Sequence, residues 1–422
     1  MLGGGTWSTQ NKKLPGAYIS FISAARANSA ISDRGTIAFP MELDWGDTVT
    51  ELTNAKLLSD AKKLLGHDYN SDELKDIREI MCRGTKLYIY RLNGTGVKAS
   101  CTYADAKYAG TRGNALKIVI ANSVDSKGGF DVSTYFDNVK VDSQTVAKAS
   151  ELIDNDYVTF KKGASLEVSA GTALVNGTDS EVDGEAYSKA MSVLSGYTFN
   201  AIGFKTTASE ILSVIKAWTI RMRDEVGSKF QTVICGDADH EGIVSVADVN
   251  AIPWVTGAIG GCGVAESLTN TTYDGEKDLK ADYTQDELED FIDKGKFVFH
   301  KVGDEVNVLM DINSLVTYTT EKGSDFAYNQ IIRVIDTIAT STASIFSTTY
   351  LGKVQNNADG RVSLKSQLVA MLNELQNIGA IENFQSDDVT VDEGNLKRAV
   401  VVNMAVTPVL AMEQLYAKVM IG

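Results

Sequence analysis

Proline, cysteine and histidine are all scarce in this chain of 422 residues, with 4, 4 and 3 copies respectively. The cysteines are scattered and form no CxxC pair, so we expect reduced core thiols and neither a disulfide framework nor a metal-binding cluster. They are Cys82, Cys101, Cys235 and Cys262. No run of about 18 apolar residues occurs, and the first residues lack the apolar stretch of a signal peptide. We therefore expect synthesis in the cytoplasm and no direct membrane insertion.

Positive charge is also in short supply, with 40 Lys and Arg against 55 Asp and Glu, which gives a formal net charge of −15. A phosphate backbone would be repelled by such a surface, so nucleic acid is not an expected partner. The hydrophobic content of 44% and the charged content of 23% are those of an ordinary folded protein. The length suggests about three domains.

Sequence motifs for catalysis are missing as well. The chain has no GxxxxGK sequence followed by Ser or Thr, which a phosphate-binding loop requires, and no GxSxG nucleophile elbow. The glycine-rich run GAIGGCG around Gly260 lacks the third glycine of a dinucleotide fingerprint, and we predict a turning loop there. We accordingly predict no catalytic residue and no cofactor.

One acidic segment, GDADHEG, contains the residues that come nearest to a metal site: Asp237, Asp239, His240 and Glu241. Carboxylates and a histidine directly after a strand could bind a divalent ion. A solvated acidic turn between a strand and a helix is the alternative, and it is the interpretation that we adopt. We therefore predict no metal, while a metal-dependent hydrolase centred on Asp237, Asp239 and His240 stays as a competing hypothesis.

Hydrophobic periodicity alternates between helical and strand spacing along most of the chain. Helical spacing occurs at 53–66, 71–84, 207–227, 284–295, 326–346 and 363–381. Thr207 with Glu210, and Thr284 with Glu287, have the spacing of a capping box. Strands are expected at 197–204, 231–236, 296–302, 305–312 and 398–406, and the stretch from 96 to 182 contains only short alternating runs typical of a small β-rich module.

A lone β-prone segment lies near each end of the chain, PGAYISFIS at 15–23 and LYAKVMIG at 415–422. A single strand cannot stabilise itself, because its backbone groups need a neighbouring strand. Each segment must therefore pair with a sheet edge, either in its own chain or in another copy.

Several segments together carry a family likeness that covers essentially the whole chain. These are the opening GGTWSTQNKKLPGAYISF, the stretch DINSLVTYT, the run FAYNQIIRVIDTIA followed by LGKVQNNADGR, and the ending VTPVLAMEQLYAKVMIG. In their joint order and spacing they resemble contractile phage tail-sheath proteins, most closely those of Gram-positive phages, defective prophages and tail-like bacteriocins.

The resemblance implies a multidomain α+β and α/β architecture. We expect an N-terminal arm at 1–33, an α/β domain at 34–95 and 183–283 with a β-rich domain inserted at 96–182, a C-terminal sheath core domain at 284–406, and a C-terminal arm at 407–422. The C-terminal domain would face the tube, and the middle domains would face outward.

The resemblance also implies that the two arms add strands to sheets of neighbouring subunits. Side chains alternate along a strand, so Leu415, Ala417, Val419 and Ile421 would form the more apolar side of the C-terminal arm. The residues predicted for intersubunit strand exchange are Ala17, Tyr18, Ile19, Phe21, Ile22, Leu415, Tyr416, Ala417, Val419 and Ile421.

The function implied is that of a structural subunit and not an enzyme. It would polymerise with itself as a helical stack of hexameric rings around a tail tube protein, contact baseplate and tail-terminator proteins, and contract to drive the tube through a bacterial envelope. The expected location is the tail of a virion or tail-like particle assembled in the host cytoplasm. A self-assembling lattice protein of the surface-layer or capsid type is the structural alternative.

Overall fold

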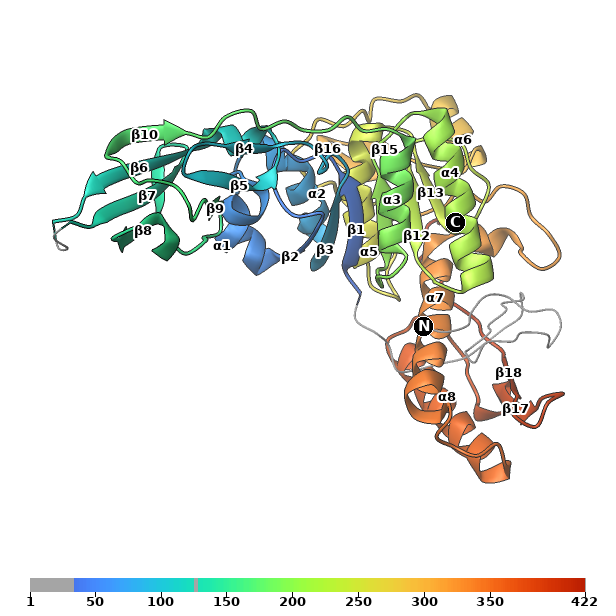
Figure 1. Ribbon diagram of the computed structural model, residues 1–422. Helices are drawn as coiled ribbons and strands as arrows, with labels where there is room; N and C mark the ends of the chain where they lie inside the picture. Colours follow the sequence, from blue (N-terminus) through green and yellow to red (C-terminus); the bar gives the residue numbers. More distant parts are fainter. Residues whose placement is uncertain (1–33, 125–127, 422) are drawn as a thin grey trace. The chain divides into compact units, whose positions relative to one another are not determined.

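The computed structural model describes residues 34–124 and 128–421, and the chain in it folds as two compact units (Figure 1). The first unit contains residues 34–37, 78–85 and 197–421, and the second contains 38–77 and 86–196. The chain crosses from one unit to the other four times: within β1 (Thr36–Met41), within α2 (Lys75–Arg83), after residue 85 and after residue 196.

The second unit contains a helix that lies in the chain between two antiparallel strands, as the spacing at 53–66 predicts. Strands β2 (Val49–Thr53) and β3 (Lys86–Arg91) pair with each other, and α1 (Asn54–Leu65) follows β2 directly. The Thr53 side chain caps the first turn of α1, and Gly66 ends the helix in a left-handed conformation at φ 80°. Helix α3 (Gly184–Leu194) ends this unit.

Two antiparallel sheets with one shared core make up the rest of the second unit, which confirms the β-rich character predicted for this stretch. Their strand orders are β10-β6-β7-β8 and β4-β5-β9. Alternate residues of β6 are buried in this core beside Trp45 and Phe136. The strands are β4 (Lys98–Ser100), β5 (Ala104–Ala109), β6 (Leu116–Asn122), β7 (Phe130–Phe136), β8 (Val139–Val146), β9 (Val158–Phe160) and β10 (Ser169–Ala173).

The first unit is built on parallel strands. The predicted strand, helix and strand after residue 197 are confirmed: α4 (Ser209–Ile220) connects β11 (Ala201–Phe204) to β12 (Gln231–Ile234), and these strands pair in parallel. Strands β13 (Ile243–Val246) and β14 (Lys296–Phe297) continue the parallel pairing. The capping box predicted at Thr207 is wrong, because α4 begins after Ala208 without a side-chain cap. Helix α4 passes into a π-helical turn, η4 (Arg221–Val226).

The glycine-rich run around Gly260 is not the turning loop that its composition predicts. It forms the end of α5 (Ile252–Gly261), a helix in which nine of ten residues are buried. A Cβ atom at Gly257 would lie 2.3 Å from the carbonyl oxygen of Ile80, and one at Gly261 would lie 1.9 Å from that of Arg83. The glycines therefore let α5 pack directly against the backbone of α2, and this contact outweighs their low helix propensity.

The remaining elements of the first unit follow the predicted order. Helix α6 (Gln285–Asp293) carries the predicted capping box of Thr284 and Glu287, and β15 (Phe299–Val302) pairs with β16 (Glu305–Val308). Helix α7 (Asn329–Ile345) continues into a π-helical turn, η7 (Phe346–Tyr350), and α8 (Ala358–Asn377) follows. The predicted apolar face of α8 is buried as expected, through Leu364, Leu368, Leu372 and Leu375.

Candidate functional site

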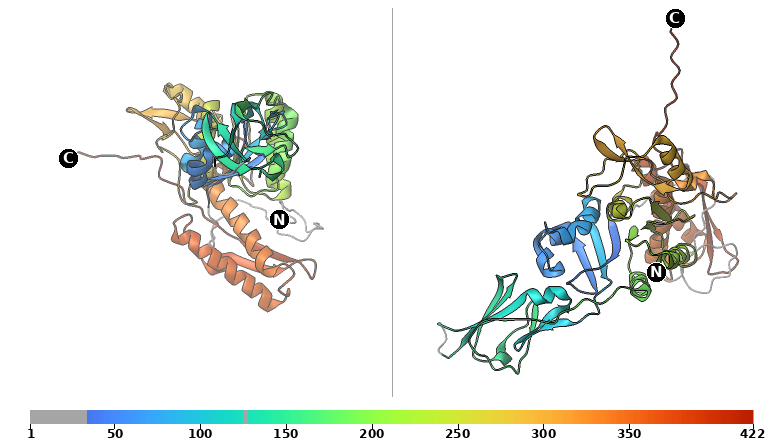
Figure 2. Two further views of the ribbon diagram at one scale, coloured as in Figure 1. Left: turned by 60° about the vertical axis from the view of Figure 1, so that its left-hand side comes forward. Right: turned by 90° about the horizontal axis from the view of Figure 1, so that it is seen from above.

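The C-terminal segment is the part of the predicted assembly site that the structure describes. The N-terminal candidates Ala17, Tyr18, Ile19, Phe21 and Ile22 lie outside the described residues. Every residue from Leu410 to Ile421 is exposed, and the segment contains no assigned helix or strand. Figure 2 shows it as an extended tail that projects from the elements of its own unit.

The exposed C-terminal segment is strongly apolar. Leu415 is 91% exposed, Val419 84% and Ile421 95%, and Tyr416 and Met420 are exposed to a similar degree. Burying one such aliphatic side chain is worth roughly 1.5–3 kcal/mol, so the segment leaves several kcal/mol of possible stabilisation unused within its own unit. A contiguous exposed apolar surface of this kind is typical of an interaction site.

The base of this segment is fixed to the first unit by backbone pairing. The Glu382 N–H donates to the Thr407 carbonyl at 3.1 Å, and the Val409 N–H donates to the Ala380 carbonyl at 3.0 Å. Further along, the Glu413 carboxylate accepts a hydrogen bond of 2.6 Å from the Thr269 hydroxyl. Beyond Glu413, the described residues form one hydrogen bond, and it is local: the Tyr416 hydroxyl donates to the Gln414 side chain. The segment is thus anchored up to residue 413 and extended after it.

An open sheet edge lies in the same unit. Strands β17 (Val389–Glu393) and β18 (Val400–Met404) form an antiparallel sheet of two strands that packs beside α8 (Figure 1). No further strand of the described chain pairs with either one. A hairpin of two strands is only marginally stable alone and presents unpaired backbone donors and acceptors along its edges.

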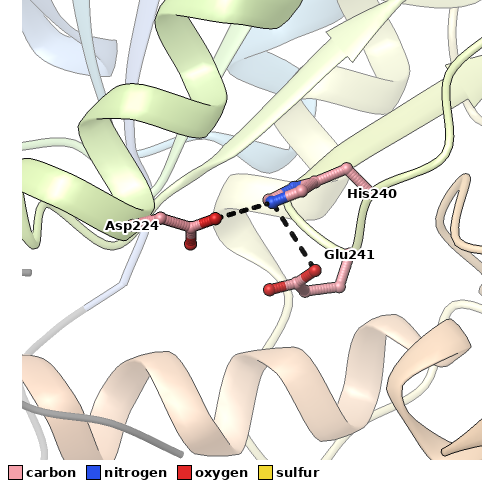
Figure 3. Close-up of side chains that lie close together, drawn as sticks. All are labelled: Asp224, His240 and Glu241. Carbon is pink, nitrogen blue, oxygen red and sulfur yellow. Dashed lines mark hydrogen bonds and ion pairs between the residues drawn. The ribbon is translucent and has the colours of Figure 1, made fainter. Parts of the chain in front are cut away.

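A second group of polar side chains converges at the end of η4, where Asp224, His240 and Glu241 meet (Figure 3). The His240 Nε2 atom lies 3.3 Å from an oxygen of Asp224 and 3.6 Å from Oε2 of Glu241. Lys322 forms an ion pair of 2.7 Å with the other Glu241 oxygen.

The pairing within this cluster sets its electrostatics. Burial raises the pKa of the Glu241 carboxyl, but the interactions with His240, Arg223 and Lys322 outweigh that effect, so its pKa is below the ordinary value. Burial likewise raises the pKa of Asp224, and its hydrogen bond with His240 outweighs that effect and lowers it.

The backbone contact of His240 determines which of its ring nitrogens carries the proton. The Gly242 N–H donates to His240 Nδ1 at 3.0 Å, so Nδ1 presents its lone pair and the ring proton of the neutral form is on Nε2, facing the carboxylates. A metal bound through Nε2 would require the opposite tautomer, in which Nδ1 donates to an acceptor. The arrangement therefore supports a hydrogen-bonded polar cluster better than a metal centre.

The acidic residues predicted for the competing hydrolase hypothesis do not join this cluster. Asp237 is highly exposed and pairs with Lys296 at 2.7 Å, while Asp239 accepts hydrogen bonds from the Val316 and Thr317 backbone N–H groups. Asp224, which the sequence motif did not contain, takes their place beside His240. The hydrolase geometry centred on Asp237, Asp239 and His240 is thus wrong.

Buried ion pairs on α7 are a feature that the sequence analysis missed. Arg223 donates to both oxygens of Asp336, at 2.7 and 2.9 Å, and Arg333 donates to Asp311 at 2.5 Å. Both arginines are almost completely buried. The signal that could have revealed these pairs is the presence of charged residues at helix positions whose apolar neighbours predict burial. Such charges are expected to be paired, since buried charges are nearly always paired.

The four cysteines differ in their burial. All four cysteines are free, but the expectation that all lie in the core is wrong, because Cys262 alone is buried and Cys82 is exposed. Burial raises the pKa of Cys262 to about 11, so this thiol stays protonated at neutral pH. Within the described parts of the chain, no helix has the length and apolarity needed to cross a bilayer.

Comparison with known protein families matches nearly the whole described chain to one class of protein. The tail sheath protein Gp18 domain III N-terminal region matches 34–92, and the phage tail sheath protein beta-sandwich domain matches 94–179. The phage tail sheath protein central domain matches 180–314, and the phage tail sheath C-terminal domain matches 321–422. The chain belongs to the phage tail sheath protein family.

Individual relatives support this membership over their full length. The Phage-like element PBSX protein XkdK of Bacillus subtilis (strain 168) is 32% identical, with 99% of each chain covered. The sheath tail protein of Desulfitobacterium hafniense has 34% identity and a TM-score of 0.81, over 96% of this chain and 99% of that one. The sheath tail protein Lin1278 of Listeria innocua has 32% identity and a TM-score of 0.82, over 92% and 94%. The predicted multidomain α and β architecture of a sheath protein is thereby confirmed.

Proposed function

We propose that this protein is the building block of a contractile tail sheath, which polymerises as stacked hexameric rings and is held together by exchange of its terminal segments. The exposed apolar C-terminal segment is the observation that carries the proposal. A strand that pairs with another copy would bury Leu415, Val419 and Ile421 on one side and satisfy its backbone groups in a ladder.

The hairpin of β17 and β18 is the acceptor that we propose for these strands. Its two edges are unpaired within the described chain, and each added strand would lengthen a sheet that is marginal with two strands. Because donor and acceptor surfaces differ, the contact is heterologous, and heterologous contacts that do not close produce a helical filament.

Contraction would follow from the contacts between copies and would need no nucleotide. If each copy buried on the order of 300 Å² more apolar surface in the contracted lattice, at about 25 cal/mol per Å², roughly 7 kcal/mol per copy would be released. The partners in this role are other copies, a tail tube protein, and baseplate and tail-terminator proteins. We propose a purely structural function in the tail of a phage or phage-like particle assembled in the host cytoplasm.

Removing residues 414–422 tests the arm model directly. Because no hydrogen bond connects residues 414–421 to the rest of the described chain, we expect the truncated protein to keep its melting temperature and circular dichroism spectrum. Negative-stain microscopy should show hollow tubes for the full chain and none for the truncation. A matched truncation of residues 1–24 should also yield a folded protein without tubes.

The same experiment separates the competing structural hypothesis. Flat sheets or closed shells from the full chain would favour a surface-layer or capsid-type lattice protein. Tubes of normal length from either truncation would refute strand exchange through that arm.

A further inference from the structure

The turn that follows α5 holds the bases of both terminal arms. On its first side, Arg34 donates from Nη2 to the Ile259 carbonyl and from Nε to the Cys262 carbonyl, both at 2.9 Å. The adjacent Gly35 N–H donates to the Gly260 carbonyl at 2.9 Å. These bonds satisfy carbonyls that the end of a helix leaves without an internal partner. Residue 34 directly follows the predicted N-terminal arm.

On its second side, the same turn contacts Gln330 of α7. This buried side chain donates from Nε2 to the Ala265 carbonyl at 2.9 Å and accepts the Ala411 N–H on Oε1 at 3.1 Å. One amide group thus connects the turn to the base of the C-terminal arm. Arg333, one turn further along α7, donates to the Glu266 carbonyl at 2.6 Å.

We propose that residues 259–266 form an arm junction, in which Arg34 and Gln330 are positioning residues that couple the base of one arm at Gly35 to the base of the other at Ala411. The path from one arm base to the other runs through Arg34, the junction backbone, Gln330 and Ala411. The inference rests on the proposed function, because the arms matter only if they connect copies.

Arg34 is suited to this task because its charge persists. Removal from water, followed by the nearby charge of Arg333, lowers the pKa of Arg34 to about 10, so the guanidinium stays protonated at neutral pH. Its bonds to the helix-end carbonyls are therefore charge-assisted and favoured by the helix dipole. A junction made of such bonds would transmit a displacement of one arm base to the other, because packed polar networks do not deform continuously.

Hydrogen exchange in the unassembled protein tests the junction independently of tube formation. Gln330→Met removes both amide contacts at similar volume, and we expect the Ala411 amide to exchange at least tenfold faster. Arg34→Met should speed exchange at Gly35 and also, by threefold or more, at Ala411, which Arg34 does not contact. The controls are Gln367→Met on the exposed face of α8 and Arg78→Met, which removes an ion pair with Glu276 outside the junction.

The Arg34→Met variant decides the question even if Gln330→Met fails to fold, because Arg34 is less buried than Gln330. Faster exchange at Ala411 in this variant, with α8 amides unchanged, supports a shared junction. Faster exchange at Gly35 with an unchanged rate at Ala411 overturns it. Failure of the wild-type chain to form tubes would instead count against the proposed function. It would not change the conclusion from the hydrogen-exchange measurement, which uses the unassembled protein.

Discussion

Replacing Val419 by alanine should weaken tube formation without affecting the folded subunit. Val419 is 84% exposed in the single copy, and it lies on the side of the C-terminal segment that also carries Leu415 and Ile421. The substitution removes two carbon atoms from a side chain that strand exchange would bury, which costs about 1.6 kcal/mol at about 0.8 kcal/mol per carbon. Since about 1.4 kcal/mol corresponds to a factor of ten, the concentration needed for assembly should rise about 15-fold.

Sedimentation of tubes over a range of protein concentrations measures this threshold. Met420→Ala is the matched control, because Met420 is equally exposed and apolar but lies on the opposite side of an extended strand. We expect a change below threefold for the control and unchanged melting temperatures for both soluble variants. An unchanged threshold for Val419→Ala, or equal effects of the two substitutions, would show that the predicted strand face is not buried in the assembly.

Two further predictions concern the charged interior of the first unit. Glu241→Gln should lower stability by about 1.5–3 kcal/mol at pH 7, because it removes a charged hydrogen-bond partner of Lys322. The pKa of Glu241 is lowered in the folded state, so its contribution to stability is present above about pH 4.5 and is lost as the pH falls through the folded pKa. Urea unfolding should show the difference in stability between the two proteins shrinking as the pH falls below 4.5. Arg333→Met should lower the free energy of unfolding by about 3–5 kcal/mol, because it leaves Asp311 buried without its cation. Adding Asp311→Leu should restore part of this stability in the same urea assay. Equal stabilities for the single and double variants would contradict this account.

Periodic and capped elements could be predicted from the sequence because their determinants are local. The leucines of α8 recur at helical spacing, and Thr284 and Glu287 form the reciprocal cap that their separation predicts. The failure at Thr207 has a local cause too, since α4 starts two residues later and leaves Thr207 outside the capping position.

Features that depend on tertiary contact could not be predicted in this way. The glycine-rich composition around Gly257 and Gly261 predicts a loop. These residues are helical because the backbone of α2 packs directly against them, and this contact cannot be inferred from the local sequence. The cluster at His240 obtained its second carboxylate from Asp224, which is 16 positions away in the sequence and is brought close by a π-helical turn. The buried pairs of Arg223 and Arg333 depend on partners that lie more distant still.

The composition of the exposed C-terminal segment has a consequence for copies that wait to be incorporated. An unpaired apolar strand can pair with any chain it meets, which makes premature aggregation a risk during synthesis in many copies. Lys418 interrupts the apolar run between Leu415 and Ile421 with a positive charge. A lysine at such a position acts as a gatekeeper that disfavours nonspecific strand pairing. The segment can therefore pair with its acceptor strand during assembly and still keep the unassembled protein soluble.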